Sequence, residues 1–258
     1  MRRDVVWVLA LLAAGWASPA LAAPRAQVGV DEKLGETIPL DLIFKDEAGQ
    51  PTALRSLFGD KPVVLTLVYF ACPGICTPLL TDLARVVDKM DLEPGKDYQI
   101  VSVSFDPSET PDIGATKKEN YLSNLKRKID PAGWRFLTGD SVQVRTLANS
   151  AGFYFERENG EWIHAGALIV VSQTGVITRY INGTEFLPFD VKMAVIEASE
   201  GRPTPTTAKI LKFCYSYDPE GRTYAMNVTR IAGIAVVLLV MIFVGVFVLR
   251  PKLKTAER

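Results

Sequence analysis

Residues 62–70, Pro-Val-Val-Leu-Thr-Leu-Val-Tyr-Phe, place the strongest constraint on the fold of this 258-residue chain. Almost all of them are apolar or β-branched, and they lack the polar alternation of a strand with one solvated face. Such a strand has to be covered on both sides. We therefore expect a central strand in a sheet that carries helices on both faces.

The segments around this run alternate between helical and extended patterns, and antiparallel pairs follow them. Thr77 precedes Pro78 and caps a helical pattern that ends near residue 93, so we expect that helix to begin at Pro78. Other strands are expected at residues 40–44, 51–54, 98–105, 134–137, 153–157, 161–164, 167–171 and 176–181, and other helices at 110–128, 140–151 and 189–200. This order predicts an α/β fold over residues 36–201, with a thioredoxin-like mixed central sheet flanked by helices.

The N-terminal segment has the pattern of a secretory signal peptide over residues 1–22. Arg2 and Arg3 precede an apolar stretch at residues 5–16, and Ala20 and Ala22 supply the small residues that a signal peptidase needs. A membrane anchor that is retained is the alternative. Residues 23–35 are mostly polar and unpatterned, so we expect them to be a flexible start of the mature protein.

The C-terminal segment predicts one transmembrane helix at residues 231–249. Its nineteen residues include no charged residue and no proline, and a helix of this length spans about 28 Å, close to the ~30 Å hydrocarbon core. Residues 202–230 would link the body to this helix. The basic tail at residues 250–258 predicts a cytoplasmic end, which places the body on the periplasmic or extracytoplasmic side of the inner (cytoplasmic) membrane.

The charge balance argues against a nucleic-acid partner. Lysine plus arginine equals aspartate plus glutamate at 29 each, so the chain has no overall basic field. A basic stretch around Lys117, Lys118, Lys126, Arg127 and Lys128 is expected to be a solvated helix face rather than a docking patch.

Cys72 and Cys76 lie between the central strand and the helix that follows it, with three residues between them. Because the helix is expected to start at Pro78, we expect both cysteines to lie in the loop. Thiolates are soft ligands that favour Cu(I) and zinc, and a helix N-terminus lowers the pKa of a nearby thiol. The spacing leaves metal binding, redox exchange and a structural disulfide open, although thioredoxin-type reductants have two intervening residues.

Two other residues could take part in such chemistry. His164 is the only histidine, and it ends a predicted hairpin strand at a sheet end where a loop can face the cysteines; any imidazole ligand must come from it. Cys214 lies in an aromatic stretch before the apolar C-terminal segment, where we expect a partly buried interfacial thiol. A second copper contact or an intermolecular disulfide are the alternatives for Cys214.

Three motifs in order resemble the Sco/SenC family of copper chaperones. They are residues 70–78 (Phe-Ala-Cys-Pro-Gly-Ile-Cys-Thr-Pro), residues 104–111 (Ser-Phe-Asp-Pro-Ser-Glu-Thr-Pro), and the stretch from His164 to Tyr180. The resemblance implies a thioredoxin-like fold in which Cys72, Cys76 and His164 bind copper, as Cu(I) with Cu(II) as a second option. It also implies delivery of the copper to the CuA centre of cytochrome c oxidase subunit II, or reduction of the cysteines that form that centre.

Two features depart from the family pattern. Family members often have an acidic residue where this chain has Ile163, and their anchor is commonly N-terminal.

Other expected partners are further copper chaperones or thioredoxin-like reductants. Metal delivery is not turnover, so we do not expect an enzyme; the alternative is a thiol:disulfide oxidoreductase that uses Cys72 and Cys76. A thiol peroxidase is weaker, because neither cysteine has a threonine three residues upstream.

Overall fold

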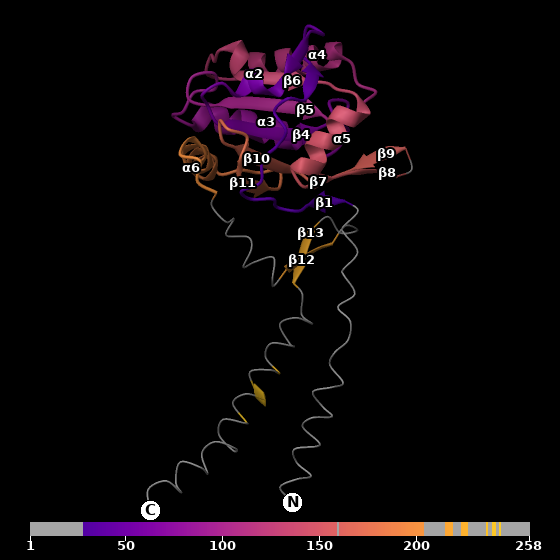
Figure 1. The fold of residues 1–258 in the computed structure, drawn as a ribbon, viewed down its shortest axis with the longest axis vertical. Coiled ribbons are helices and arrows are strands. Elements are labelled where there is room, and N and C mark those ends of the chain that lie inside the picture. Colours follow the sequence, from indigo (N-terminus) through magenta and orange to yellow (C-terminus); the bar gives the residue numbers. More distant parts are fainter. Residues whose placement is uncertain are drawn as a thin grey trace, which may run out of the picture. The chain divides into compact units, whose positions relative to one another are not determined.

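The computed structural model describes residues 28–158, 160–203, 215–218 and 223–226, and residues 236, 239, 240 and 243. The chain divides into two units, residues 1–203 and 204–258, and Figure 1 shows the fold. Within the described part of the second unit, β12 (Tyr215–Asp218) pairs antiparallel with β13 (Thr223–Met226).

A five-stranded mixed sheet forms the centre of the first unit, in the order β11-β10-β4-β5-β6. Strands β4, β5 and β6 run parallel, whereas β10 is antiparallel to both β4 and β11. The bounds are β4 Val63–Val68, β5 Gln99–Ser104, β6 Trp134–Leu137, β10 Ala167–Val171 and β11 Ile177–Asn182. The mixed sheet with a central apolar strand is the arrangement that the sequence predicts, and all six residues of β4 are buried.

Helices cover both faces of the sheet, as expected. Alternate residues of β4 belong to different cores: Val63, Leu65 and Leu67 pack in one, and Val64 and Val68 in the other. The first core includes side chains of α2 (Leu54–Phe58) and α5 (Ser141–Ser150), and the second includes α3 (Cys76–Lys89) and α6 (Pro188–Ser199). Helix α4 (Pro111–Asn124) packs partly buried side chains against the second core.

Short strands and turns connect these elements. They are β2 (Ile43–Lys45) paired with β3 (Pro51–Ala53), β8 (Glu156–Glu158) paired with β9 (Glu161–Ile163), and the 3-10 turn η1 (Pro131–Gly133). Asp140 caps α5 by accepting hydrogen bonds from the backbone N–H groups of Val142 and Gln143, as its position predicts.

The expectation that residues 23–35 form an unpatterned, flexible start is corrected for residues 29–30. These residues form β1 (Gly29–Val30), which pairs antiparallel with β7 (Phe153–Tyr154), and the backbone N–H of Asp31 donates to the carbonyl of Gly152 at 2.8 Å. The partner strand lies more than 120 residues away in the chain. A pairing of this kind leaves no local periodicity by which the sequence could predict it.

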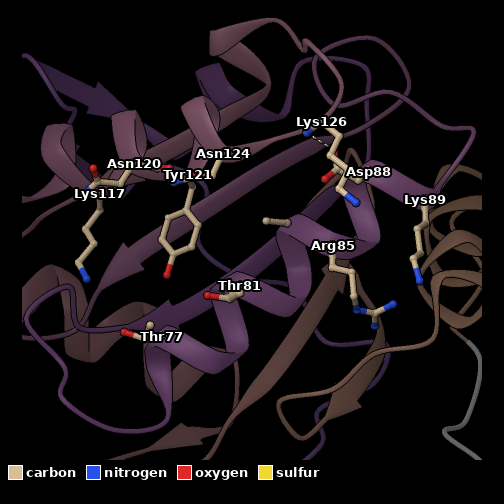
Figure 2. A pocket seen from close by; sticks show the side chains of 11 residues that line it. Thr77, Thr81, Arg85, Asp88, Lys89, Lys117, Asn120, Tyr121, Asn124 and Lys126 are labelled. Atoms are coloured by element: carbon tan, nitrogen blue, oxygen red, sulfur yellow. Dashed lines mark hydrogen bonds between the residues drawn. The ribbon is translucent and has the colours of Figure 1, made fainter.

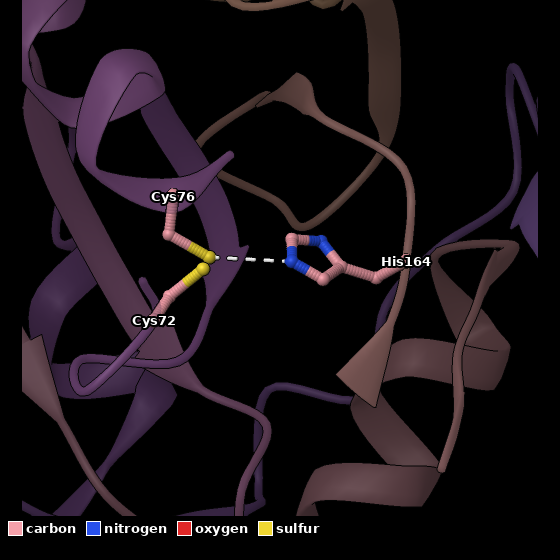
Figure 3. Close-up of side chains that lie close together, drawn as sticks. All are labelled: Cys72, Cys76 and His164. Atoms are coloured by element: carbon pink, nitrogen blue, oxygen red, sulfur yellow. Dashed lines mark hydrogen bonds between the residues drawn. The ribbon is translucent and has the colours of Figure 1, made fainter. Parts of the chain in front are cut away.

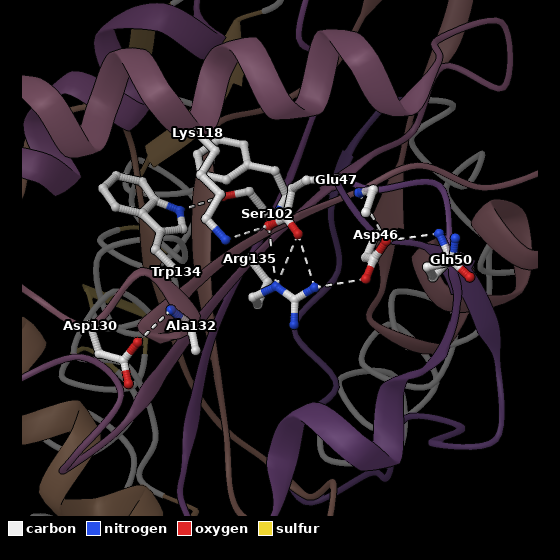
Figure 4. A network of polar contacts seen from close by, with 11 residues as sticks. Asp46, Glu47, Gln50, Ser102, Lys118, Asp130, Ala132, Trp134 and Arg135 are labelled. Atoms are coloured by element: carbon white, nitrogen blue, oxygen red, sulfur yellow. Dashed lines mark hydrogen bonds and ion pairs between the residues drawn. The ribbon is translucent and has the colours of Figure 1, made fainter.

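A polar network joins the turn between β2 and β3 to β6 and α4 (Figure 4). Glu47 forms ion pairs with Arg135 at 2.9 Å and Lys118 at 3.0 Å, and it accepts a hydrogen bond from the backbone N–H of Phe136 at 2.8 Å. Although burial opposes it, these hydrogen bonds hold the pKa of Glu47 below its ordinary value. The network fixes one edge of the sheet. It also engages Lys118 in an ion pair, although the sequence predicts a solvated position for this residue.

Several predicted segments fall outside the described residues. Among the residues that are described, no helix has the length and apolar character needed to cross a membrane. The span predicted at residues 231–249 is described at only four positions, so it stays a prediction. The signal peptide (residues 1–22), the tail (residues 250–258) and Cys214 lie outside the described part.

Candidate metal centre

The two cysteines come from a loop and from the first turn of a helix. Cys72 lies in the loop after β4, but Cys76 is the first residue of α3, with Ile75 as its N-cap. The expectation that α3 begins at Pro78, and that both cysteines lie in the loop, is therefore wrong. Pro78 occupies the third helical position, where the missing N–H costs nothing because the first four N–H groups of a helix have no intrahelical partner.

His164 reaches the cysteines from the segment that follows β9, and Figure 3 shows the three side chains facing one another. Its Nε2 atom lies 3.3 Å from Sγ of Cys76, and its Nδ1 atom lies 2.9 Å from the carbonyl oxygen of Ala165. A carbonyl can only accept, so the Nδ1 atom carries the proton. The Nε2 atom then directs its lone pair at the sulfur atoms, which is the arrangement of a histidine ready to bind a metal.

The donor atoms of Cys72, Cys76 and His164 all lie within 4.8 Å of one another. Two ligands at about 2.0–2.3 Å from one ion can be at most about 4.6 Å apart. Three ligands around one ion lie closer, at about 3.5–4.0 Å from one another, so a contraction of about 1 Å brings all three onto one ion. The side chains are 7%, 2% and 9% exposed, respectively, so the site is largely shielded from water.

The two thiols share one proton unequally. The pKa of Cys72 lies well below its ordinary value, first because of a hydrogen bond with Cys76 and then because of polar contacts with His164 and Tyr69. Burial and the same contact with Cys72 raise the pKa of Cys76. The backbone N–H of Gly74 also donates to Sγ of Cys72 at 3.3 Å. The pair is thus a Cys72 thiolate that accepts a hydrogen bond from the Cys76 thiol.

An aromatic wall holds the imidazole in place. The ring centroid of His164 lies 4.9 Å from that of Phe105 and 5.8 Å from that of Tyr69, both in edge-on geometry. Phe105 in turn stacks on Phe155 at 4.5 Å. Edge-on aromatic contacts favour a single ring orientation and exclude water. The wall therefore fixes the orientation of the imidazole ring.

Glu109 holds the backbone of the cysteine loop through hydrogen bonds, a role that the sequence analysis did not predict. Its side chain is 8% exposed. It accepts hydrogen bonds from the backbone N–H groups of Phe70 at 2.7 Å and Ala71 at 2.6 Å, and from the hydroxyl of Ser104 at 2.5 Å. Glu109 lies within one of the three motifs quoted above, but only the fold shows that it contacts the loop.

Ile163 occupies the position where an acidic residue was noted as common in the family. Its side chain is 39% exposed, and it pairs with Glu156 across the β8–β9 hairpin. Among the described residues, the group that could hold a metal ion consists of Cys72, Cys76 and His164. Ile163 adds no donor to it.

Comparison with known proteins places this geometry in a family. The SCO1/SenC family model matches residues 36–197. A curated protein of Stutzerimonas stutzeri, whose name refers to copper binding, is 28% identical over 142 residues, which are 53% of this chain and 65% of that protein. The chain thus spans slightly less than two thirds of that relative.

Solved structures agree with the family model on the fold. A protein of Aquifex aeolicus VF5 named for electron transfer has 26% identity and a TM-score of 0.59, covering 66% of this chain and 95% of its own. BsSco, a member of the Sco family of cytochrome c oxidase assembly proteins, has 23% identity and a TM-score of 0.52, covering 66% and 97%. The family model spans more than half of the chain, and the chain therefore belongs to the SCO1/SenC family, with the thioredoxin-like fold.

Proposed function

We propose that this protein is a membrane-anchored copper chaperone that delivers copper to the CuA centre of cytochrome c oxidase subunit II. Cys72 and Cys76 bind Cu(I) as thiolates, and His164 supplies the nitrogen ligand. The observation that carries the proposal is the grouping of two sulfur atoms and one imidazole nitrogen within 4.8 Å in a shielded site. The names of the relatives, which refer to copper binding and to oxidase assembly, support the same function.

The donor set favours copper over zinc. Structural zinc sites almost always have four ligands, whereas two or three soft donors suffice for Cu(I). The group in the described part of the chain has three members, two of which are cysteines. The imidazole also makes the set acceptable to Cu(II), because nitrogen ligands suit that oxidation state.

The origin of the ligands suggests how copper leaves. Cys72 and Cys76 share one loop and helix start, whereas His164 comes from the segment after β9. An incoming thiolate can replace the imidazole while both sulfur atoms keep the ion. The acceptor's ligands then displace the two cysteines one at a time, and the cysteines regain the shared proton.

We place this exchange on the periplasmic or extracytoplasmic side of the inner membrane. The proposal rests on the signal-peptide pattern of residues 1–22 and the apolar, uncharged character of residues 231–249. Fusing a reporter enzyme that is active on only one side of the membrane to the end of the body, before residue 231, tests this placement. A cytoplasmic body would contradict the placement.

Copper transfer to subunit II tests the function. The full-length chain in detergent is loaded with Cu(I) and mixed with the reduced, copper-free subunit II of the same organism, and the absorbance of the CuA centre is followed. We expect the centre to form with the wild-type chain and to fail with Cys72→Ser. No gain over free Cu(I) at equal concentration would contradict delivery.

A thiol:disulfide oxidoreductase is the second candidate, because the lowered pKa of Cys72 provides a thiolate nucleophile beside a thiol. In this reaction Cys72 attacks a disulfide of the partner, and Cys76 resolves the mixed disulfide, so that a Cys72–Cys76 disulfide forms. The partner leaves with two thiols, which take one proton from Cys76 and one from water. A thioredoxin-like reductant then has to reduce the Cys72–Cys76 disulfide before another round. His164 has no required part in this reaction. Reduction of oxidised subunit II by His164→Ala at the wild-type rate, with no copper bound by wild type, would favour this candidate.

A further inference from the structure

A groove of about 510 Å³ runs between α3 and α4, beside the metal centre. Figure 2 shows side chains from both helices pointing into it. Its lining includes Thr77, which directly follows Cys76, and the groove extends along α3 to Lys89. A ligand lying in the groove would therefore have one end next to a proposed metal ligand.

The groove carries an excess of positive charge. Lys89, Lys117 and Lys126 line it, and none of their ammonium groups forms an ion pair with any residue that the structure describes. Arg85 also lines the groove but is bound to Asp82 at 2.6 Å. Of the other two lysines of the basic stretch, Lys118 forms an ion pair with Glu47 at 3.0 Å, and Lys128 lies outside the groove lining. Three lysines whose ammonium groups form no ion pair with a described residue thus lie together in the groove.

Asp88 is the one acidic residue of the lining, and its single negative charge does not offset the three lysines. Oδ1 of Asp88 accepts hydrogen bonds from the backbone N–H groups of Lys126 at 2.9 Å and Arg127 at 3.2 Å. These bonds fix the chain where it leaves α4, so Asp88 holds Lys126 beside the groove. Asp88 is thus held by backbone N–H groups, whereas the ammonium groups of the three groove lysines have no ion-pair partner among the described residues.

The floor of the groove is rigid and partly apolar. The ring of Tyr121 stacks on Trp134 at 5.6 Å and on Phe136 at 6.2 Å, and Thr81 lines the groove beside it. Ala84 lies between the polar lining residues of α3. A rigid floor with hydroxyl and amide groups along it can bind a peptide backbone without first having to order itself.

The spread of the charges indicates an elongated ligand. Figure 2 shows Lys117 near the Thr77 end, and Lys89 and Lys126 towards the other end. Thr77 and Lys89 are twelve helical residues apart, which is about 18 Å and matches five or six extended peptide residues at about 3.3 Å each. A compact anion such as phosphate would instead need donors that converge on one point.

We propose that this groove docks an acidic peptide segment of the protein that exchanges copper with this chain. The inference rests on the proposed function for the identity of the partner. The sulfur atoms are buried, so an incoming thiolate needs to be held next to them while ligands exchange. Charge complementarity along the groove would position the partner and speed its association.

Peptide binding to the full-length chain in detergent tests the proposal. The probe is a fluorescent hexapeptide of alternating Asp and Glu, and its anisotropy is read at low and moderate salt. We expect Lys117→Glu combined with Lys126→Glu to weaken binding by about tenfold or more. The matched control is Lys45→Glu combined with Lys96→Glu, which makes the same charge change outside the groove lining and should leave the affinity near that of wild type.

Other outcomes would overturn the proposal. Equal weakening in both double variants would mean non-specific attraction, and no binding by wild type would mean no site. Binding of inorganic phosphate or of phosphatidylglycerol vesicles that depends on the groove lysines, without binding of the peptide, would assign the groove to a phosphate group. Copper stoichiometry is measured on the same samples. If the wild-type chain binds no copper, the proposed function is contradicted. The peptide assay still shows whether the groove binds an acidic segment, because its readout does not depend on copper.

Discussion

Oε1 of Glu109 accepts a hydrogen bond of 2.6 Å from the backbone N–H of Ala71, the residue directly before Cys72. The other carboxylate oxygen accepts from the N–H of Phe70 and from the hydroxyl of Ser104. A buried carboxylate thus links the loop that carries Cys72 to the end of β5. The position of the first sulfur atom depends on a residue 37 positions further along the chain.

Replacing this carboxylate should loosen the loop. In Glu109→Gln, the amide nitrogen has to face at least one N–H donor, so a charge-assisted hydrogen bond worth about 1.5–3 kcal/mol is lost. We expect the free energy of unfolding to fall by a similar amount and the affinity for copper to fall with it. Urea unfolding and a copper competition assay measure the two effects. Glu119→Gln, at an exposed position of α4, is the matched control, and an equal loss there would refute the role of Glu109.

Acid should act on the fold partly through Glu47. Its pKa in the folded chain lies below the ordinary value of 4.5, so its contribution to stability is present above pH 4.5 and is lost as the pH falls through the folded pKa. Glu47→Gln should lower the free energy of unfolding by about 2 kcal/mol at pH 7. The gap between wild type and variant should narrow below pH 4.5. A gap that stays constant from pH 7 to pH 3 in urea titrations would show that the ionised carboxylate contributes nothing.

The proton shared by the cysteines predicts an unusual alkylation profile. In a Cys214→Ser background, Cys72 should react with iodoacetamide at pH 5 nearly as fast as at pH 8, because its lowered pKa leaves it a thiolate throughout. Mass spectrometry locates the label. Adding Cys76→Ala removes the largest cause of the lowered pKa and should shift the profile towards alkaline pH, whereas Cys76→Ser keeps a donor and should shift it less. If the alkylation rate of Cys72 in the Cys214→Ser protein rose tenfold per pH unit between pH 6 and pH 8, Cys72 would not be a thiolate at neutral pH, and the lowered pKa would be contradicted.

Local patterns in the sequence were enough to predict the core of the fold. The apolar run at residues 62–70 predicts a strand covered on both faces, and the alternation of helices and strands predicts the mixed sheet. Asp140 as a cap and the hairpin just before His164 were also predictable, because caps and tight turns have signatures within a few residues. The second strand of the hairpin ends at Ile163, one residue earlier than predicted. The three motifs at residues 70–78, 104–111 and 164–180 were enough to indicate the Sco/SenC family.

Contacts between distant segments were not predictable in the same way. The pairing of β1 with β7 and the support of Ala71 by Glu109 depend on the folded arrangement, not on neighbouring residues. The start of α3 was misplaced for a different reason. The helix begins two residues earlier than predicted, and Thr77 is helical although it precedes a proline. Pro78 fits the third helical position without losing a hydrogen bond.

Copper titration of the full-length chain in detergent tests the central claim most directly. Cu(I) is added under anaerobic, reducing conditions in competition with a coloured chelator. We expect one tightly bound copper per wild-type chain, no chelator-resistant copper in Cys72→Ser, and an affinity at least about tenfold lower in His164→Ala. Cys214→Ser serves as the control and should match wild type. Unchanged stoichiometry and affinity in both Cys72→Ser and His164→Ala would contradict the account.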